Sequence, residues 1–190
     1  MSPAKFRRFL ICCFPKLDKD AFLLAQIVGW EELNLVGGPV NIYQGRKYIG
    51  QSKLDIRNLG DTLSVSFGRD KDVVVTRVKV KGKTNNQLLG GTKKSSVAYN
   101  ISVANHHATP IYIEVQDQVP ISSDKEVLVT IDEMGGGILE DKIGVLTWGL
   151  SLQPTETKTV EFGFSIKYPK YKAVKIEYQK SRQMEQINYF

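Results

Sequence analysis

The stretch that decides the fold is residues 97–104, Val-Ala-Tyr-Asn-Ile-Ser-Val-Ala. Its large apolar side chains fall at every second position, and small or polar residues lie between them. A period of two places one face of a strand in a core and the other face in water. The same alternation recurs at residues 111–116, 127–131 and 160–166. Strands of this kind, joined by short polar turns, predict an antiparallel, immunoglobulin-like β-sandwich for the C-terminal half.

The residues before this half also favour strands, so we expect an all-β chain. An apolar run at residues 21–28 and a hairpin around Gln44-Gly45 lie in this part. Residues 62–67 and 73–80 are expected to be two strands joined by a turn at 68–72. The predicted organisation is a β-rich subdomain at 15–94 followed by a sandwich at 95–168.

The two ends of the chain hold its basic charge. Of the net charge of +6, residues 1–14 carry +3 and residues 167–190 carry +4, which leaves −1 for 15–166. A nucleic-acid-binding domain needs a basic face on its folded part, so binding of nucleic acid through the folded body is not expected. We expect residues 1–14 to be an extension outside the fold and 169–190 to be a basic tail.

The first residues also bear on localisation. The apolar stretch at residues 9–14 is shorter than a secretory signal needs, and bulky Ile11 precedes Cys12. We therefore expect no complete export signal in this chain. It has no apolar run long enough for a transmembrane helix either.

No catalytic constellation is evident in the sequence. The two histidines, His106 and His107, are adjacent, and neighbouring side chains point apart, so we expect a solvated loop pair rather than a metal site. Cys12 and Cys13 are expected to lie outside the fold, and carboxylates at strand ends are common turn residues. The sequence predicts no enzyme, no metal and no cofactor.

Four residues are the candidates for a binding site: Arg69, Asp70, Asp117 and Gln118. Arg69-Asp70 follows Gly68, which favours either an anion or partner contact or a structural turn. In the structural reading, Asp70 bonds its own backbone and Arg69 pairs across the sheet. Trp30 follows an apolar run and Trp148 lies in an alternating strand, so we expect core or inter-sheet packing for both rather than a carbohydrate platform.

Several stretches in a fixed order resemble the C-terminal domain of the mucoidy inhibitor A (MuiA)-like family, a bacterial domain of unknown function. The most specific pieces are Gly68-Arg69-Asp70 and Asp117-Gln118-Val119-Pro120. The resemblance covers about Pro15 to Lys170 and rests on residues 21–31, 38–50, 61–70, 117–122, 144–148 and 152–170.

This resemblance implies a periplasmic or cell-envelope location and no established catalytic residues. Family members usually carry an N-terminal β domain and a coiled coil, which this chain lacks, so we expect a fragment or a stand-alone copy. The favoured function is a non-catalytic interaction or structural module of the envelope, binding a protein partner by addition of a strand. The alternative is a carbohydrate-binding or carbohydrate-cleaving sandwich that acts on envelope polysaccharide.

Overall fold

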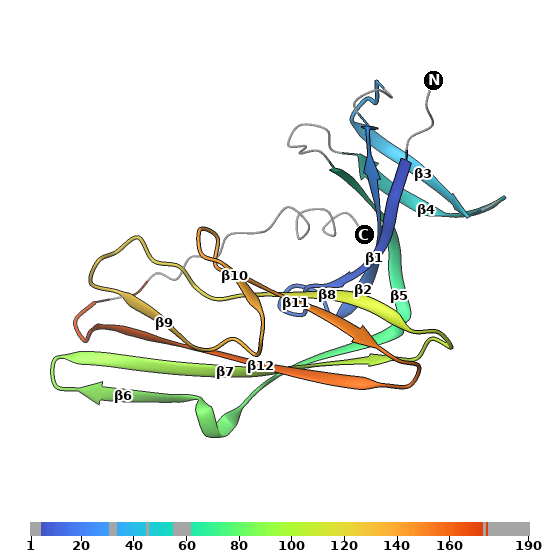
Figure 1. Cartoon of the computed structure of the whole chain (residues 1–190). Helices are drawn as coiled ribbons and strands as arrows, with labels where there is room; N and C mark the ends of the chain where they lie inside the picture. Colours follow the sequence, from blue (N-terminus) through green and yellow to red (C-terminus); the bar gives the residue numbers. More distant parts are fainter. Residues whose placement is uncertain (1–4, 31–33, 45, 55–61, 173, 175–190) are drawn as a thin grey trace.

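The computed structural model describes residues 5–30, 34–44, 46–54, 62–172 and 174. Within these ranges the chain forms twelve strands and a short 3-10 turn at Lys81–Lys83, which confirms the predicted all-β fold (Figure 1). The strands are β1 (Lys5–Cys13), β2 (Asp20–Val28), β3 (Gly38–Gln44), β4 (Lys47–Leu54), β5 (Thr62–Lys79), β6 (Asn85–Leu89), β7 (Thr92–Asn105), β8 (Ile111–Gln118), β9 (Leu128–Glu133), β10 (Ile138–Glu140), β11 (Val145–Leu152) and β12 (Thr157–Pro169).

Ten strands form one sheet, in the order β10-β11-β8-β1-β2-β5-β7-β12-β9, with β6 beside β7. The hairpin β3–β4 is separate. Figure 1 shows β7, β12 and β9 in one layer and β8, β11 and β10 in a layer across from it. Trp148 of β11 and Phe162 of β12 meet between these layers with ring centroids 5.5 Å apart. The long sheet thus folds back on itself as a sandwich, and β1, β2 and β5 connect its halves.

The core follows from the alternation in the sequence. Inward residues of β7, β8, β11 and β12 pack as one cluster that includes Ile101, Val103, Ile113, Val115 and Phe162, all fully buried. A smaller cluster holds Cys12, Phe14, Phe22, Leu24 and Val145.

The expectation that residues 1–14 lie outside the fold is wrong for the described part of this segment. β1 pairs antiparallel with β2 and parallel with β8, so it occupies the middle of the sheet. Cys13 joins the main core and Cys12 the smaller cluster, because successive side chains of a strand point to opposite faces. Both thiols are buried, and burial raises the pKa of each well above its usual value. Because β1 pairs parallel with β8, the sheet is mixed rather than wholly antiparallel.

The predicted boundary between residues 94 and 95 falls inside β7, and the predicted turn at 68–72 lies within β5. β5 pairs with β2 through its first part and with β7 through its second. One strand therefore runs through the predicted turn from one half of the sheet to the other. The register is irregular there: Ala21 pairs with Asp70, whereas Asp20 pairs with Val74. Gly68 has a φ of +105°, which side chains rarely allow.

Most of the predicted basic tail, 169–190, lies outside the described residues. Pro169 ends β12, and Lys172 and Val174 are described. Among the residues that the structure describes, none belongs to a helix with the length and apolar character needed to cross a membrane.

Candidate functional site

Arg69 lies on β5 and is tied to the turn before β2. Its Nη1 lies 2.7 Å from Asp18 Oδ2 and 2.6 Å from Asp20 Oδ2, and Lys71 Nζ also reaches Asp20 Oδ2 at 2.7 Å. Bonds from Lys71 and Arg69 lower the pKa of Asp20. This arrangement is a pairing between neighbouring strands, as in the structural reading of Gly68-Arg69-Asp70.

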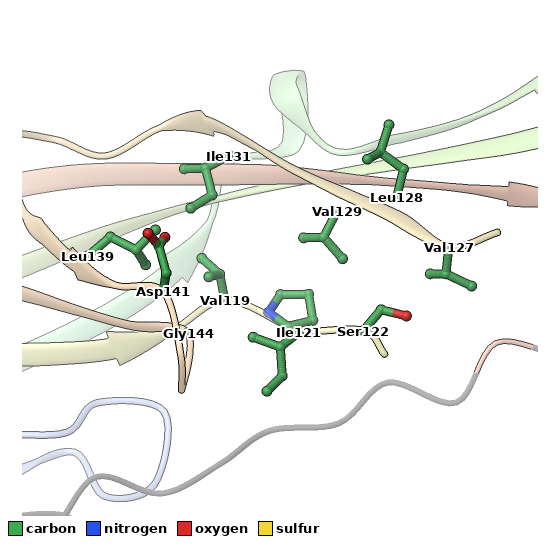
Figure 2. A pocket seen from close by; sticks show the side chains of 11 residues that line it. Val119, Ile121, Ser122, Val127, Leu128, Val129, Ile131, Leu139, Asp141 and Gly144 are labelled. Atoms are coloured by element: carbon green, nitrogen blue, oxygen red, sulfur yellow. The ribbon is translucent and has the colours of Figure 1, made fainter. Parts of the chain in front are cut away.

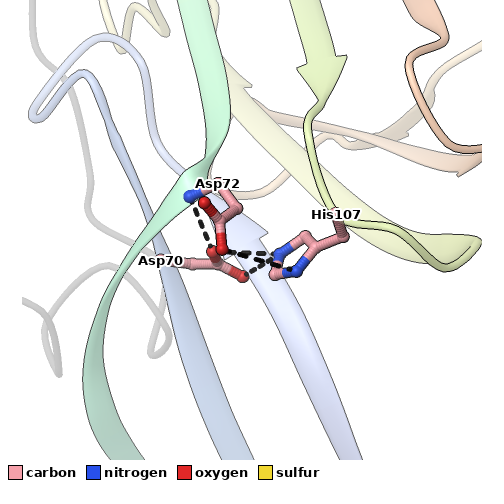
Figure 3. A group of neighbouring side chains, drawn as sticks. All are labelled: Asp70, Asp72 and His107. Carbon is pink, nitrogen blue, oxygen red and sulfur yellow. Dashed lines mark hydrogen bonds and ion pairs between the residues drawn. The ribbon is translucent and has the colours of Figure 1, made fainter.

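Successive side chains of a strand point to opposite faces, so Asp70 lies on the other face of β5 from Arg69. Figure 3 shows Asp70 meeting His107 of the β7–β8 connection. His107 Nε2 lies 2.9 Å from Asp70 Oδ2, and the Asp72 backbone N–H donates to Asp70 Oδ1 at 3.1 Å. His106 is exposed as expected, but His107 is half-buried. The two histidines are therefore not an equivalent solvated pair.

Asp117 and Gln118 end β8 and are 0% and 3% exposed, so neither can touch a partner's surface directly. Arg77 Nε of β5 donates to Asp117 Oδ2 at 2.6 Å, which joins the two layers of the sandwich. The guanidinium of Arg77 also lies 3.5 Å from the centroid of the Tyr99 ring. Burial raises the pKa of Asp117, and the bonds from Arg77 offset part of that rise.

Lys16 approaches the same buried pair from the β1–β2 turn. Its Nζ lies 3.4 Å from Gln118 Oε1. The pKa of Lys16 is lowered to about 8, chiefly by burial, while the charge of Asp117 raises it and that of Arg77 lowers it. Lys16, Arg77, Asp117 and Gln118 form a structural cluster in which each side chain has a polar partner.

An open groove of about 350 Å³ lies elsewhere, between the two ends of the folded sheet (Figure 2). β9 and β10 are the end strands of the sheet order, and both contribute to the lining. We call this cavity the β9 groove. It is lined by Val119, Pro120, Ile121, Ser122, Val127, Leu128, Val129, Ile131, Leu139, Asp141 and Gly144.

Sequence reasoning missed Arg77, although a signal was present. Val73 and Val75 point inward, and Arg77 continues their period of two. A charge at an inward position predicts a buried ion pair. Asn105 was also missed. It is fully buried and anchors the β7–β8 connection, but nothing around residue 105 separates an anchoring asparagine from an ordinary turn residue.

The chain is similar to the Caenorhabditis elegans protein F37C4.5, with 22% identity over 181 residues. That similarity covers 86% of this chain and 32% of the nematode protein, so the chain spans about a third of this relative. Residues 25–170 match the family described as a domain of unknown function, DUF4139. The name of the mucoidy inhibitor family is not part of this match and stays a resemblance. Because the match spans most of the chain, the protein belongs to the DUF4139 family.

Proposed function

We propose that this domain is a non-catalytic interaction module that binds an extended segment of a partner protein in the β9 groove. The observation that carries the proposal is the position of this apolar groove beside β9 and β10, which each pair with one strand among those that the structure describes. The outer edge of such a strand presents backbone N–H and C=O groups that pair with an added strand. The neighbouring apolar side chains then provide pockets for alternate residues of the added strand.

The composition of the lining favours binding over catalysis. Of the eleven residues that line the groove, Asp141 alone has an acidic or basic side chain. General acid–base or nucleophilic chemistry needs a pair of groups within hydrogen-bond reach. Leu128 supports the binding reading, because it lines the groove and is 60% exposed.

The charge around the groove indicates the chemistry of the partner. Residues 119–144 carry six acidic residues and two lysines, in a chain whose net charge is +6. Lys172 already binds this acidic surface, with its Nζ 2.5 Å from Asp124 Oδ2 and 2.6 Å from Glu126 Oε2. Those bonds raise the pKa of Lys172 to about 12. The preferred segment therefore alternates apolar and basic residues.

The proposed interaction requires no particular cellular compartment. The envelope location is an implication of the family resemblance, and a relative occurs in a nematode. The carbohydrate alternative loses one of its two tryptophans, because Trp148 is 2% exposed and donates from Nε1 to the Met134 carbonyl at 2.7 Å, whereas Trp30 is half-buried. We therefore favour a protein partner.

The test is fluorescence anisotropy with two labelled ten-residue peptides, one alternating valine and lysine and the other alternating valine and glutamate. We expect the lysine peptide to bind with a Kd of about 10 µM, in the range of a transient interaction, and the glutamate peptide at least about tenfold more weakly. Leu128→Asp should weaken binding of the lysine peptide at least about tenfold, because it places a charge in the apolar lining.

Leu88→Asp is the matched control. Leu88 lies on β6, which pairs with β7 alone among the described strands, and it is 72% exposed. Both variants change an exposed leucine on an end strand, so both should fold. The proposal is wrong if the lysine peptide does not bind, or if the two variants weaken binding equally.

A further inference from the structure

Asp70, Asp72 and His107 converge on one point, although the sequence gives them separate roles (Figure 3). One ligand atom from each residue lies within 4.8 Å of those of the other two. His107 Nε2 is 3.0 Å from Asp70 Oδ1 and 2.9 Å from Asp70 Oδ2, and Nδ1 is 3.8 Å from Asp72 Oδ2. The distances from Nε2 to Asp70 match the roughly 3–3.5 Å between ligands that lie about 2.0–2.2 Å from Zn²⁺. Asp72 lies beside the other ring nitrogen, so its exposed carboxylate must move closer to Nε2 for all three residues to bind one ion.

The backbone of β5 places both carboxylates on one face. Asp70 and Asp72 are two residues apart, so their side chains share a side of the strand, while Arg69 and Lys71 face Asp20 on the other side. The register irregularity between β2 and β5 falls at these residues. Irregularities of this kind re-aim side chains and are frequent beside functional sites.

The third residue, His107, is held in place by a buried asparagine. Asn105 is 0% exposed, and its Nδ2 donates toward the carbonyls of Thr109, Leu152 and Gln153 at 3.0–3.3 Å. Its Oδ1 accepts the His107 backbone N–H at 2.9 Å. The adjacent His106 N–H donates to the Asp72 carbonyl at 2.7 Å. These bonds fix the β7–β8 connection against β5, so the imidazole is positioned before any ligand arrives.

The charges of this cluster also favour the binding of a cation. In the described ranges, the ion pairs of Asp70 and Asp72 are with His107 alone, and no lysine or arginine reaches them within 4.0 Å. Two carboxylates thus share one imidazole. Asp70 is 11% exposed at its side chain, so water screens its charge poorly, whereas Asp72 is 68% exposed and leaves the site open to solvent.

We propose that Asp70, Asp72 and His107 form a binding site for a divalent transition-metal ion, with Zn²⁺ as the expected cation. An imidazole with two carboxylates suits Zn²⁺ better than Mg²⁺ or Ca²⁺, which prefer oxygen ligands throughout. Three protein ligands leave a coordination position for water. The ion would join β5 to the β7–β8 connection, and this inference does not depend on the β9 groove.

The competing reading is an ion pair between protonated His107 and Asp70, with no metal. The chain offers a clean way to distinguish the two, because it has two histidines and the other one, His106, is exposed and outside the cluster. Titration of the full chain with ZnCl₂, followed by isothermal calorimetry and by the imidazole signals in NMR, reports both affinity and location.

We expect one Zn²⁺ per chain and a shift of the His107 signals without a shift of those of His106. His107→Gln and Asp72→Asn should each weaken binding at least about tenfold, and His106→Gln should leave it unchanged. Asp72→Asn is the safer variant for folding, because Asp72 is mostly exposed. The proposal is overturned if Zn²⁺ does not bind below about 1 mM, or if His106→Gln weakens binding as much as His107→Gln does.

Discussion

Two arginines on the same strand, β5, pair with aspartates of other elements, and the two pairs differ in their surroundings. Arg69 is 32% exposed at its side chain and pairs with Asp18 and Asp20 at the surface. Arg77 is 17% exposed, lies over Tyr99 and pairs with a fully buried Asp117. The sequence draws attention to Arg69, because it follows a glycine and precedes an aspartate. The comparison teaches that Arg77, which has no such motif, joins the two layers of the sandwich.

Removal of Arg77 should give the largest loss of stability, and it therefore tests the difference between the two pairs most directly. Arg77→Met leaves the Asp117 carboxylate buried without its partner, and we expect a loss of about 3–5 kcal/mol in the free energy of unfolding. Chemical denaturation at pH 7, followed by circular dichroism, measures the loss. The deficit should shrink as pH falls, because burial raises the pKa of Asp117 and protonation removes its charge.

The double variant Arg77→Met with Asp117→Leu is the control for this prediction. Replacing both members of a buried pair by apolar residues is often neutral, so most of the lost stability should return. A loss below about 1 kcal/mol for Arg77→Met alone would place this pair in the same class as a surface pair.

Lys16 is a second cation beside the buried pair of Arg77 and Asp117, and the surface pair of Arg69 has no buried cation of this kind in the described residues. Burial lowers its pKa to about 8 from an ordinary value of 10.5, so below pH 8 the folded state holds a charged lysine at a cost. Between pH 8 and 10.5 the unfolded state binds more protons, and the stability of the wild-type chain rises with pH. Lys16→Met should be more stable than wild type by about 1 kcal/mol at pH 7.

That advantage should disappear between pH 8 and pH 10.5, as the lysine loses its proton in both states. Denaturation curves of both proteins across this range give the difference directly. An advantage that is independent of pH would show that packing of the methionine, rather than charge, is responsible.

Arg69→Met should have the smallest effect. We expect a loss of less than about 1 kcal/mol, because the ions are solvated and Asp20 keeps Lys71 as a partner. The loss should decrease further when NaCl is raised from about 0.05 M to about 1 M, since salt screens exposed pairs. Denaturation at the two salt concentrations measures this, and an effect equal to that of Arg77→Met would remove the distinction between the two pairs.

The sequence predicted strands well where the alternation is regular. Residues 97–104, 111–116 and 160–166 lie within β7, β8 and β12. These strands have one face toward the core, which is the condition under which a period of two appears. β1 has no such pattern because it is buried on both faces at Cys12 and Cys13, so its apolar run was read as an extension.

The sites were harder to predict than the strands, for a physical reason. Asp70 was a candidate from its motif, but His107 comes from another connection, and their meeting depends on the pairing of β5 with β7. The β9 groove depends on which strands end the sheet, and pairing order is not encoded in the alternation of any single strand. Local pattern identifies elements, while a site made by distant elements needs the topology.

The parallel pairing of β1 with β8 has a consequence for folding order. Ile11 of β1 pairs with Ile113 of β8, so the second neighbour of β1 is synthesised about 100 residues after β1 itself. During synthesis β1 can pair early with β2, since Cys13 and Ala21 are close in sequence. Its other edge stays open until β8 emerges, and an open edge is a template for wrong pairing. Chains interrupted before residue 111 should therefore aggregate more readily than the complete domain, and folding should be slow because this contact closes so long a loop.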